Sequence, residues 1–166
     1  MDTFERAIAA ITDLQQDGII DDYAIGGAMA VAFWSEPTAT FDLDVFVELK
    51  SSGPLVSLEP IYSWARQRDY KIQSEHIVIG GLPVQIIPTP DRLAEEAVAE
   101  AASLVYGDSQ VRVIRPEYLI ALFLEPTART AKRLTRVAML LELESLDRRL
   151  LTDILQRYNL SLPTPL

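Results

Sequence analysis

The chain has 166 residues, of which 49% are hydrophobic and 23% are charged, a composition typical of soluble globular proteins. It has no cysteine and one histidine, so disulfides, zinc–thiolate sites, cysteine nucleophiles and multi-histidine metal sites are excluded. The net charge of −9 argues against sequence-independent nucleic-acid binding, which needs basic surface, but clustered carboxylates still attract divalent cations.

The first half of the chain predicts alternating helices and strands. Apolar residues at helical spacing predict a helix from Asp2 to about Gln16, ended by Asp17 and Gly18. The next predicted elements are a strand at 20–25, a helix at 28–34, a loop at 35–40, a strand at 42–49, a break at 51–54 and a helix at 55–68.

The second half predicts a hairpin and then mostly helices. Two strands at 72–79 and 82–87 are joined by Gly80 and Gly81, a hairpin signal. After them we expect a helix at 91–102, a short strand at 111–114, and helices at 116–124, 129–144 and 147–158. This order predicts an α+β fold in one domain, 1–166, with a core at about 18–115 and C-terminal helices at about 116–158.

The N-terminal sequence predicts neither export nor a membrane span. MDTFERAIAAITDL carries early acids and no basic segment before a long apolar run, so we expect no signal peptide. No stretch approaches the roughly 18 consecutive apolar residues of a membrane-spanning helix. We therefore expect a cytoplasmic protein that has no membrane partner.

Two aspartates flank one leucine in the predicted strand FDLDVFVEL. Residues two apart in a strand point to the same face, so Asp42 and Asp44 project together, roughly 6 to 7 Å apart. Carboxylates this close repel each other, and burial adds to the cost. A divalent cation removes both problems, because Mg²⁺ commonly takes one or two protein carboxylates together with substrate phosphates.

A glycine pair precedes these aspartates. Gly26 and Gly27 let backbone amides approach a phosphate without side-chain obstruction, and the helix that begins there adds a favourable dipole. Each feature alone has a simpler interpretation: a Gly-Gly pair is often a plain tight turn, and an Asp-x-Asp is often a solvent-facing pair on an edge strand. The order of strand, Gly-Gly, helix, loop and DLDVFV is more specific than either feature.

This combination resembles the signature of the nucleotidyltransferase superfamily, which includes DNA polymerase beta and the minimal nucleotidyltransferases. The signature is a hydrophobic residue, Gly, Gly or Ser, a spacer, and Asp-x-Asp or Asp-x-Glu. Here it is IGG at 25–27, a spacer of fourteen residues, and Asp42-Leu43-Asp44. GGLPVQIIP and VRVIRPEYLIALFL, with the basic helix that follows, also look like the AbiEii-type toxin branch. The resemblance covers about residues 20–158.

The resemblance implies a nucleotidyltransferase-type mixed sheet flanked by helices. It also implies transfer of a nucleoside monophosphate from an NTP to a hydroxyl of RNA, protein or a small molecule, with Mg²⁺ or Mn²⁺ as cofactor. Asp42 and Asp44 would be the metal ligands and catalytic residues, and Gly26, Gly27 and Lys132 would bind the nucleotide. A homodimer or a cognate protein partner, as in a toxin–antitoxin pair, is also implied.

The chain departs from the family pattern at several positions. Gln85 stands where active members usually have a third carboxylate, and an amide is a weaker cation ligand and cannot act as a base. Phe123 replaces a lysine, and Arg133 and Arg136 stand where acids are expected. A second hypothesis therefore stays open: the protein keeps the fold, has lost the chemistry, and acts as a binding or regulatory partner.

Three further features have open interpretations. Arg129, Lys132, Arg133 and Arg136 form a basic stripe, which contacts a triphosphate, RNA or an acidic partner, or else is a solvated face balanced by nearby acids. Glu48 lies on the strand face of Asp44 but is expected to be solvated at the strand end. We expect His76 on the solvent side of its strand.

Overall fold

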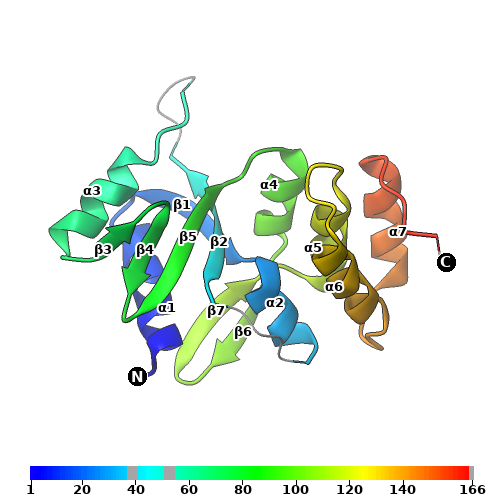
Figure 1. Ribbon diagram of the computed structural model, residues 1–166, viewed down its shortest axis with the longest axis horizontal. Coiled ribbons are helices and arrows are strands. Elements are labelled where there is room, and N and C mark those ends of the chain that lie inside the picture. Colours follow the sequence, from blue (N-terminus) through cyan, green and yellow to red (C-terminus); the bar gives the residue numbers. More distant parts are fainter. Residues whose placement is uncertain (37–40, 51–54, 165–166) are drawn as a thin grey trace.

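A single mixed sheet organises the computed structural model, which describes residues 1–36, 41–50 and 55–164 (Figure 1). Within these residues seven strands lie in the order β3-β4-β5-β2-β1-β7-β6. The strands are β1 (Ile20–Ile25), β2 (Leu43–Leu49), β3 (Lys71–Gln73), β4 (His76–Ile79), β5 (Leu82–Pro88), β6 (Ala102–Tyr106) and β7 (Ser109–Val113). β2 runs parallel to β5 and β1 parallel to β7, and the other neighbouring strands are antiparallel.

Helices cover the sheet and extend it at one end. They are α1 (Thr3–Gln16), α2 (Gly27–Trp34), α3 (Glu59–Gln67), α4 (Arg92–Ala99), α5 (Pro116–Leu124), α6 (Ala131–Leu141) and α7 (Arg148–Arg157). Figure 1 shows α5, α6 and α7 together at the end of the molecule opposite α3, and α5 packs on both α6 and α7. The predicted α+β architecture of a mixed sheet with flanking helices and a helical C-terminal segment is confirmed.

The two faces of β2 have different environments. Leu43, Val45 and Val47 are fully buried in the core, to which α1 and α4 contribute. The alternate residues Asp44 and Phe46 are only half-buried on the other face. Because side chains alternate along a strand, burying the apolar set forces Asp44 onto the opposite face of the sheet.

Local sequence signals determine where the helices begin. Asp2 accepts a hydrogen bond from the Glu5 amide (2.8 Å) while the Glu5 carboxylate accepts from the Asp2 amide (2.9 Å), a capping box at the start of α1. Asp91 caps α4 and Thr130 caps α6, each through one side-chain hydrogen bond from a helix amide. None of the described helices is long and apolar enough to cross a membrane.

Several predicted boundaries are wrong. The helix expected at 129–144 is the shorter α6, Ala131–Leu141. The strand expected at 72–79 is two strands, β3 and β4, separated by a turn in which Ser74 has φ 54°. The helix expected at 91–102 ends at Ala99, and β6 follows directly and forms a hairpin with β7. Helix α3 begins at Glu59 rather than Leu55. The break at 51–54 and most of the loop at 35–40 lie outside the described residues.

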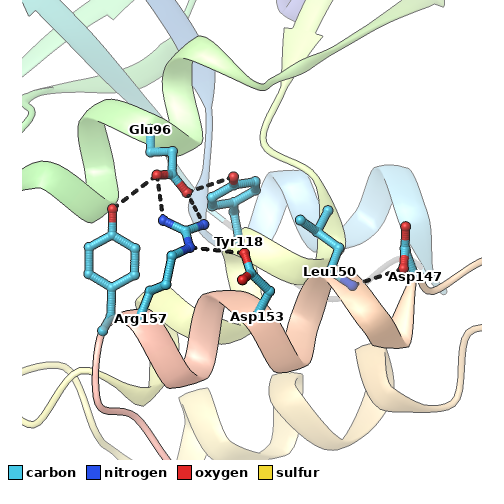
Figure 2. Close-up of polar contacts among 7 residues, drawn as sticks. Glu96, Tyr118, Asp147, Leu150, Asp153 and Arg157 are labelled. Carbon is cyan, nitrogen blue, oxygen red and sulfur yellow. Dashed lines mark hydrogen bonds and ion pairs between the residues drawn. The ribbon is translucent and has the colours of Figure 1, made fainter.

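A hydrogen-bonded cluster attaches α7 to the rest of the protein (Figure 2). Both carboxylate oxygens of Glu96 on α4 accept from the Arg157 guanidinium, each at 2.8 Å. Glu96 also accepts from the hydroxyls of Tyr118 on α5 (2.8 Å) and Tyr158 (3.2 Å). The Nε of Arg157 donates to Asp153 one turn earlier (2.9 Å). The donors lower the pKa of Glu96 to about 2, with the Arg157 hydrogen bonds as the largest cause.

Candidate functional site

Three polar residues form a row across the sheet. In the strand register Asp44 lies opposite Gln85, and Gln85 lies opposite His76 on β4. Cross-strand partners share one face of a sheet, so all three side chains lie on the face away from the main core. The structure thus confirms that Gln85 stands on the strand next to Asp44, where the sequence pattern led us to expect a carboxylate.

His76 is closer to the aspartates than predicted. Its Nε2 lies 3.4 Å from Oδ2 of Asp42, and its side chain is only 25% exposed. As expected, His76 lies on the face opposite the buried Ile77 and Ile79, but its side chain is only partly open to solvent. Asp42 itself precedes β2 by one residue, and its side chain is 43% exposed.

The glycine pair forms the predicted turn between β1 and α2. The Gly26 amide donates to the Asp44 carbonyl oxygen (3.0 Å), which joins the turn to β2. Gly27 has φ +60°, and a Cβ there would overlap Oδ2 of Asp44 and lie 3.1 Å from its Cγ. Helix α2 begins at Gly27 without a side-chain cap, so its first amide groups are available at this turn. Glycine is required here for two reasons, the backbone angle and the close approach of Asp44.

We predict that Gly27→Ala destabilises the protein more than an alanine substitution at a glycine where only the backbone angle is unfavourable. Gly81→Ala is the matched control, because Gly81 has φ +88° but a Cβ there would have no atom within 4 Å. Left-handed strain costs about 1–2 kcal/mol for a non-glycine residue, and Gly27→Ala adds the collision with Asp44. Chemical denaturation should show Gly27→Ala to be the less stable variant, by about 1 kcal/mol or more. Equal losses would show that Asp44 moves aside freely.

The carboxylate of Asp44 is poorly satisfied. Its Oδ1 is buried and has no hydrogen-bond partner among the described residues. Burial raises the pKa of Asp44, and the nearby charge of Asp42 raises it further. Arg133, Arg136 and His76 act in the opposite direction but do not reverse the shift. A buried carboxylate oxygen that lacks a hydrogen-bond partner costs folding free energy, as expected for a group that binds a ligand.

Helix α6 brings two arginines toward the aspartates. Arg133 is half-buried, and its Nη1 donates to the Ala128 carbonyl oxygen (2.9 Å). The Arg136 guanidinium lies 6.0 Å from the centre of the Phe123 ring. Burial and the charge of Arg133 lower the pKa of Arg136, whereas Asp44 and Asp42 raise it. The basic stripe is therefore not one solvated face.

The other two cations of the stripe are oriented differently. Lys132, predicted to bind the nucleotide, is exposed, and Arg129 donates to the Ser161 carbonyl oxygen (2.8 Å). Arg133 precedes the buried residues Val137 and Leu140 by four and seven positions, so it lies on the apolar side of α6. A charge on the apolar side of a helix was the sequence signal that would have separated Arg133 from Lys132.

A cavity of about 270 Å³ opens beside Asp44 and Gly27. Its walls come from the sheet, from α5 and from α6, and include Ile87, Leu122, Phe123 and Arg133. Phe123, at the position where the family resemblance led us to expect a lysine, thus contributes an apolar wall. The volume is at the lower end for small-molecule sites, which are typically about 300 to 1,000 Å³. Glu48, in contrast, accepts a hydrogen bond from Thr89 (2.9 Å) and lines a different hollow.

Two acids stand together in the wall of this cavity. Burial raises the pKa of Glu125 to about 7, and its hydrogen bond to Asp91 adds to the shift. Asp91 also accepts from the Ala94 amide (2.9 Å), which keeps its carboxylate at the start of α4. The sequence analysis did not identify this pair, because the two residues are brought together only by the packing of α4 against α5.

We predict that Glu125→Gln removes part of the pH dependence of stability. The folded-state pKa of Glu125 lies above its ordinary value of 4.5, so its contribution to stability is complete below pH 4.5 and is lost as pH rises through about 7. Because Glu125 is only partly buried, we expect a difference of about 1 kcal/mol between wild type and variant across pH 5 to 8. Thermal unfolding at pH 5 and at pH 8 measures this difference, and Glu100→Gln, at an exposed position, is the control. Parallel curves for wild type and Glu125→Gln would contradict the prediction.

The residues present fit a cation site of two protein carboxylates. The described residues contain no group of three or more histidine, cysteine, aspartate or glutamate side chains placed to hold a metal ion together. Asp44 does offer a buried oxygen without a partner, and Asp42 lies beside it in the chain. Such a pair holds Mg²⁺ when substrate phosphates and water complete the coordination.

Comparison with known proteins identifies the fold. No protein family and no curated protein matches the sequence. Among solved structures, the solution structure of the antibiotic-resistance factor ANT(2'')-Ia is 17% identical with a TM-score of 0.54, covering 96% of this chain and 93% of that chain. The crystal structure of ANT(2'')-Ia in complex with adenylyl-2''-tobramycin is also 17% identical at 0.54, with coverage of 92% and 97%.

A third similar structure is an antigenic nucleotidyltransferase-like protein from Paracoccidioides brasiliensis. It is 13% identical with a TM-score of 0.58, and the match covers 95% of this chain and 89% of that chain. At these identities the similarity concerns the fold, and the fold is of the nucleotidyltransferase type. The closer likeness to the AbiEii-type branch stays a prediction from sequence.

Proposed function

We propose that this protein binds an NTP together with a divalent cation and transfers the nucleoside monophosphate to a hydroxyl acceptor. The observation that carries the proposal is Oδ1 of Asp44, which is buried and has no hydrogen-bond partner among the described residues, in a carboxylate that lies against the Gly27 turn. A fold of the nucleotidyltransferase type supports the same conclusion.

Each part of the site has a role in this proposal. Asp42 and Asp44 hold Mg²⁺ or Mn²⁺, and the uncapped start of α2 at Gly26 and Gly27 faces the phosphates. When bound, the cation supplies positive charge that stabilises the reacting phosphate and the leaving pyrophosphate. Asp44 would hold such a cation with a carboxylate that has one buried oxygen without a hydrogen-bond partner, and the cation's charge would offset the cost of that burial.

The acceptor belongs in the cavity beside Asp44. Its apolar wall and limited volume favour a small molecule, or one group of a larger one, over a nucleic-acid strand. A small-molecule acceptor agrees with the adenylyl-2''-tobramycin complex of the similar structure. Gln85 remains neutral at pH 7, so it can position the acceptor hydroxyl by hydrogen bonding but cannot remove its proton.

Calorimetric titration with ATP, GTP, CTP and UTP, with and without Mg²⁺ or Mn²⁺, tests the proposal. We expect cation-dependent binding by the wild type and its loss in Asp42→Ala/Asp44→Ala. Glu142→Ala/Glu144→Ala is the matched control, because it removes two exposed carboxylates with the same spacing. If folded wild type binds no nucleotide at millimolar nucleotide and metal, the transferase proposal fails and the partner-binding alternative takes its place.

A further inference from the structure

Two arginines of α6 adjoin the proposed nucleotide site. The sequence analysis placed both in the basic stripe but named only Lys132 as a nucleotide ligand. Arg133 lines the cavity that also contains Gly27 and Asp44. Arg136 lies above the ring of Phe123, which is another wall of that cavity. Resting on the function proposed above, we propose that Arg133 and Arg136 bind the triphosphate directly and do so without the divalent cation.

The position of Arg133 is set by the start of α6. Thr130 caps this helix by accepting from the Arg133 amide (3.2 Å), and Arg133 Nη1 donates to Ala128 (2.9 Å). These two contacts hold both ends of the residue, the backbone and the guanidinium, beside the cavity. A guanidinium held in advance loses less conformational entropy when it binds a phosphate.

Arg136 is a half-buried cation next to another cation. Burial and the charge of Arg133 both disfavour its ionised form, and Asp44 and Asp42 are the groups that oppose them. An arrangement of two like charges in a partly buried site costs free energy in the absence of an anion. A bound polyphosphate removes this cost, because it places several negative oxygens between the two guanidinium groups.

The charges of the site lead to the same conclusion. Asp42 and Asp44 balance Arg133 and Arg136, so these four side chains have a formal net charge of zero. Gln85 adds no third carboxylate beside Asp44. A bound divalent cation cancels the formal charge of the two aspartates, which leaves Arg133 and Arg136 as the positive charges for the triphosphate. During transfer they stabilise the charge that develops on the leaving pyrophosphate.

Lys132 is less suited to this role than the two arginines. Its side chain is exposed, whereas Arg133 and Arg136 are half-buried beside the aspartates. An arginine also presents paired donors to phosphate oxygens, whereas lysine acts as a point charge. The structure thus assigns triphosphate binding to Arg133, which follows Lys132 in α6, and to Arg136, nearly one turn later.

Binding of inorganic tripolyphosphate in the presence of EDTA tests this inference directly. Calorimetry should compare wild type with Arg133→Gln, Arg136→Gln, Lys132→Gln and the remote, exposed Arg149→Gln on α7. We expect each of the first two substitutions to weaken binding by about tenfold, the usual order for a charge-assisted contact. The last two should weaken it by less than about threefold. Arg133→Lys and Arg136→Lys, which keep the charge, should fall between.

The outcomes separate this inference from the proposed function. If Lys132→Gln weakens tripolyphosphate binding more than either arginine variant, or if all four variants bind equally, the inference is overturned. Asp42→Ala/Asp44→Ala should keep tripolyphosphate binding in EDTA while it loses Mg-ATP binding. Mg-ATP binding that depends on the aspartates but not on the arginines would leave the function standing and refute the inference. Thermal unfolding of every variant confirms that it is folded.

Discussion

Asp44→Asn is expected to stabilise the folded protein while it abolishes cation-dependent nucleotide binding. Burial and Asp42 raise the pKa of Asp44 despite the opposing charges of Arg133 and Arg136, so the ionised carboxylate is a net cost to the apo fold at pH 7. Asparagine has a similar size and removes the charge. We expect the free energy of unfolding to rise by about 1 kcal/mol, the lower end of the penalty for an unsatisfied buried polar atom.

The effect on binding should be much larger and opposite in sign. Groups that only support a metal ligand change metal affinity by about 10- to 100-fold when mutated, so loss of a direct ligand should exceed roughly 100-fold. Calorimetry with Mg-ATP measures this loss, and thermal unfolding without nucleotide measures the gain in stability. A stabilised protein that no longer binds is the signature of a residue retained for function rather than for folding.

Asp13→Asn is a suitable control for both measurements. Asp13 is an exposed residue of α1, and the substitution removes the same charge from the protein. We expect it to change neither stability nor Mg-ATP affinity beyond about 0.5 kcal/mol. If Asp44→Asn instead destabilises the protein, Asp44 is a structural counter-ion of the α6 arginines, and the site needs a different explanation.

Glu96→Ala is expected to cause a large loss of stability without acting at the cavity. Glu96 accepts two hydrogen bonds from Arg157 and one each from Tyr118 and Tyr158, and these contacts connect α4 with α5 and with the end of α7 (Figure 2). Alanine cannot accept these hydrogen bonds, so all four are lost. Because the cluster is partly exposed, we expect a loss of about 2 to 3 kcal/mol in the free energy of unfolding.

This loss should depend on pH in a defined direction. Hydrogen bonds from Arg157 lower the pKa of Glu96 to about 2, below its ordinary value of 4.5. A lowered folded-state pKa means that the stabilisation is present above pH 4.5 and disappears as pH falls through about 2. The difference between wild type and Glu96→Ala should therefore be full at pH 7 and shrink at pH 3. At pH 7 we expect a decrease in Tm of about 4 to 12 °C.

The neighbouring Glu95→Ala provides the control. Glu95 is an exposed residue of the same helix, so the substitution matches the change in side chain and in helix propensity. We expect Tm to change by less than about 2 °C. A pH-independent loss in Glu96→Ala would show that packing around the side chain, rather than the ion pair, supports α7.

Local patterns in the sequence were sufficient for most of the fold. The alternation of Leu43, Val45 and Val47 predicted a strand with one buried face, and this burial is what places Asp44 on the other face. The position of Gln85 beside Asp44 followed from the family resemblance. The order of β1, glycine turn and α2 followed from neighbouring residues. Such features depend on the periodicity of the chain and on turn chemistry, which are local properties.

The contents of the candidate site were decided by contacts between distant segments. His76 reaches Asp42 because β4 pairs with β5, Glu125 meets Asp91 because α5 packs on α4, and Arg133 faces the cavity while Lys132 does not. The first two outcomes depend on how one element packs against another, to which the hydrophobic pattern of a single element is insensitive. The sequence by itself therefore determined the strand–turn–helix unit and its two aspartates. Only the tertiary structure decided which cations, acids and apolar walls surround them.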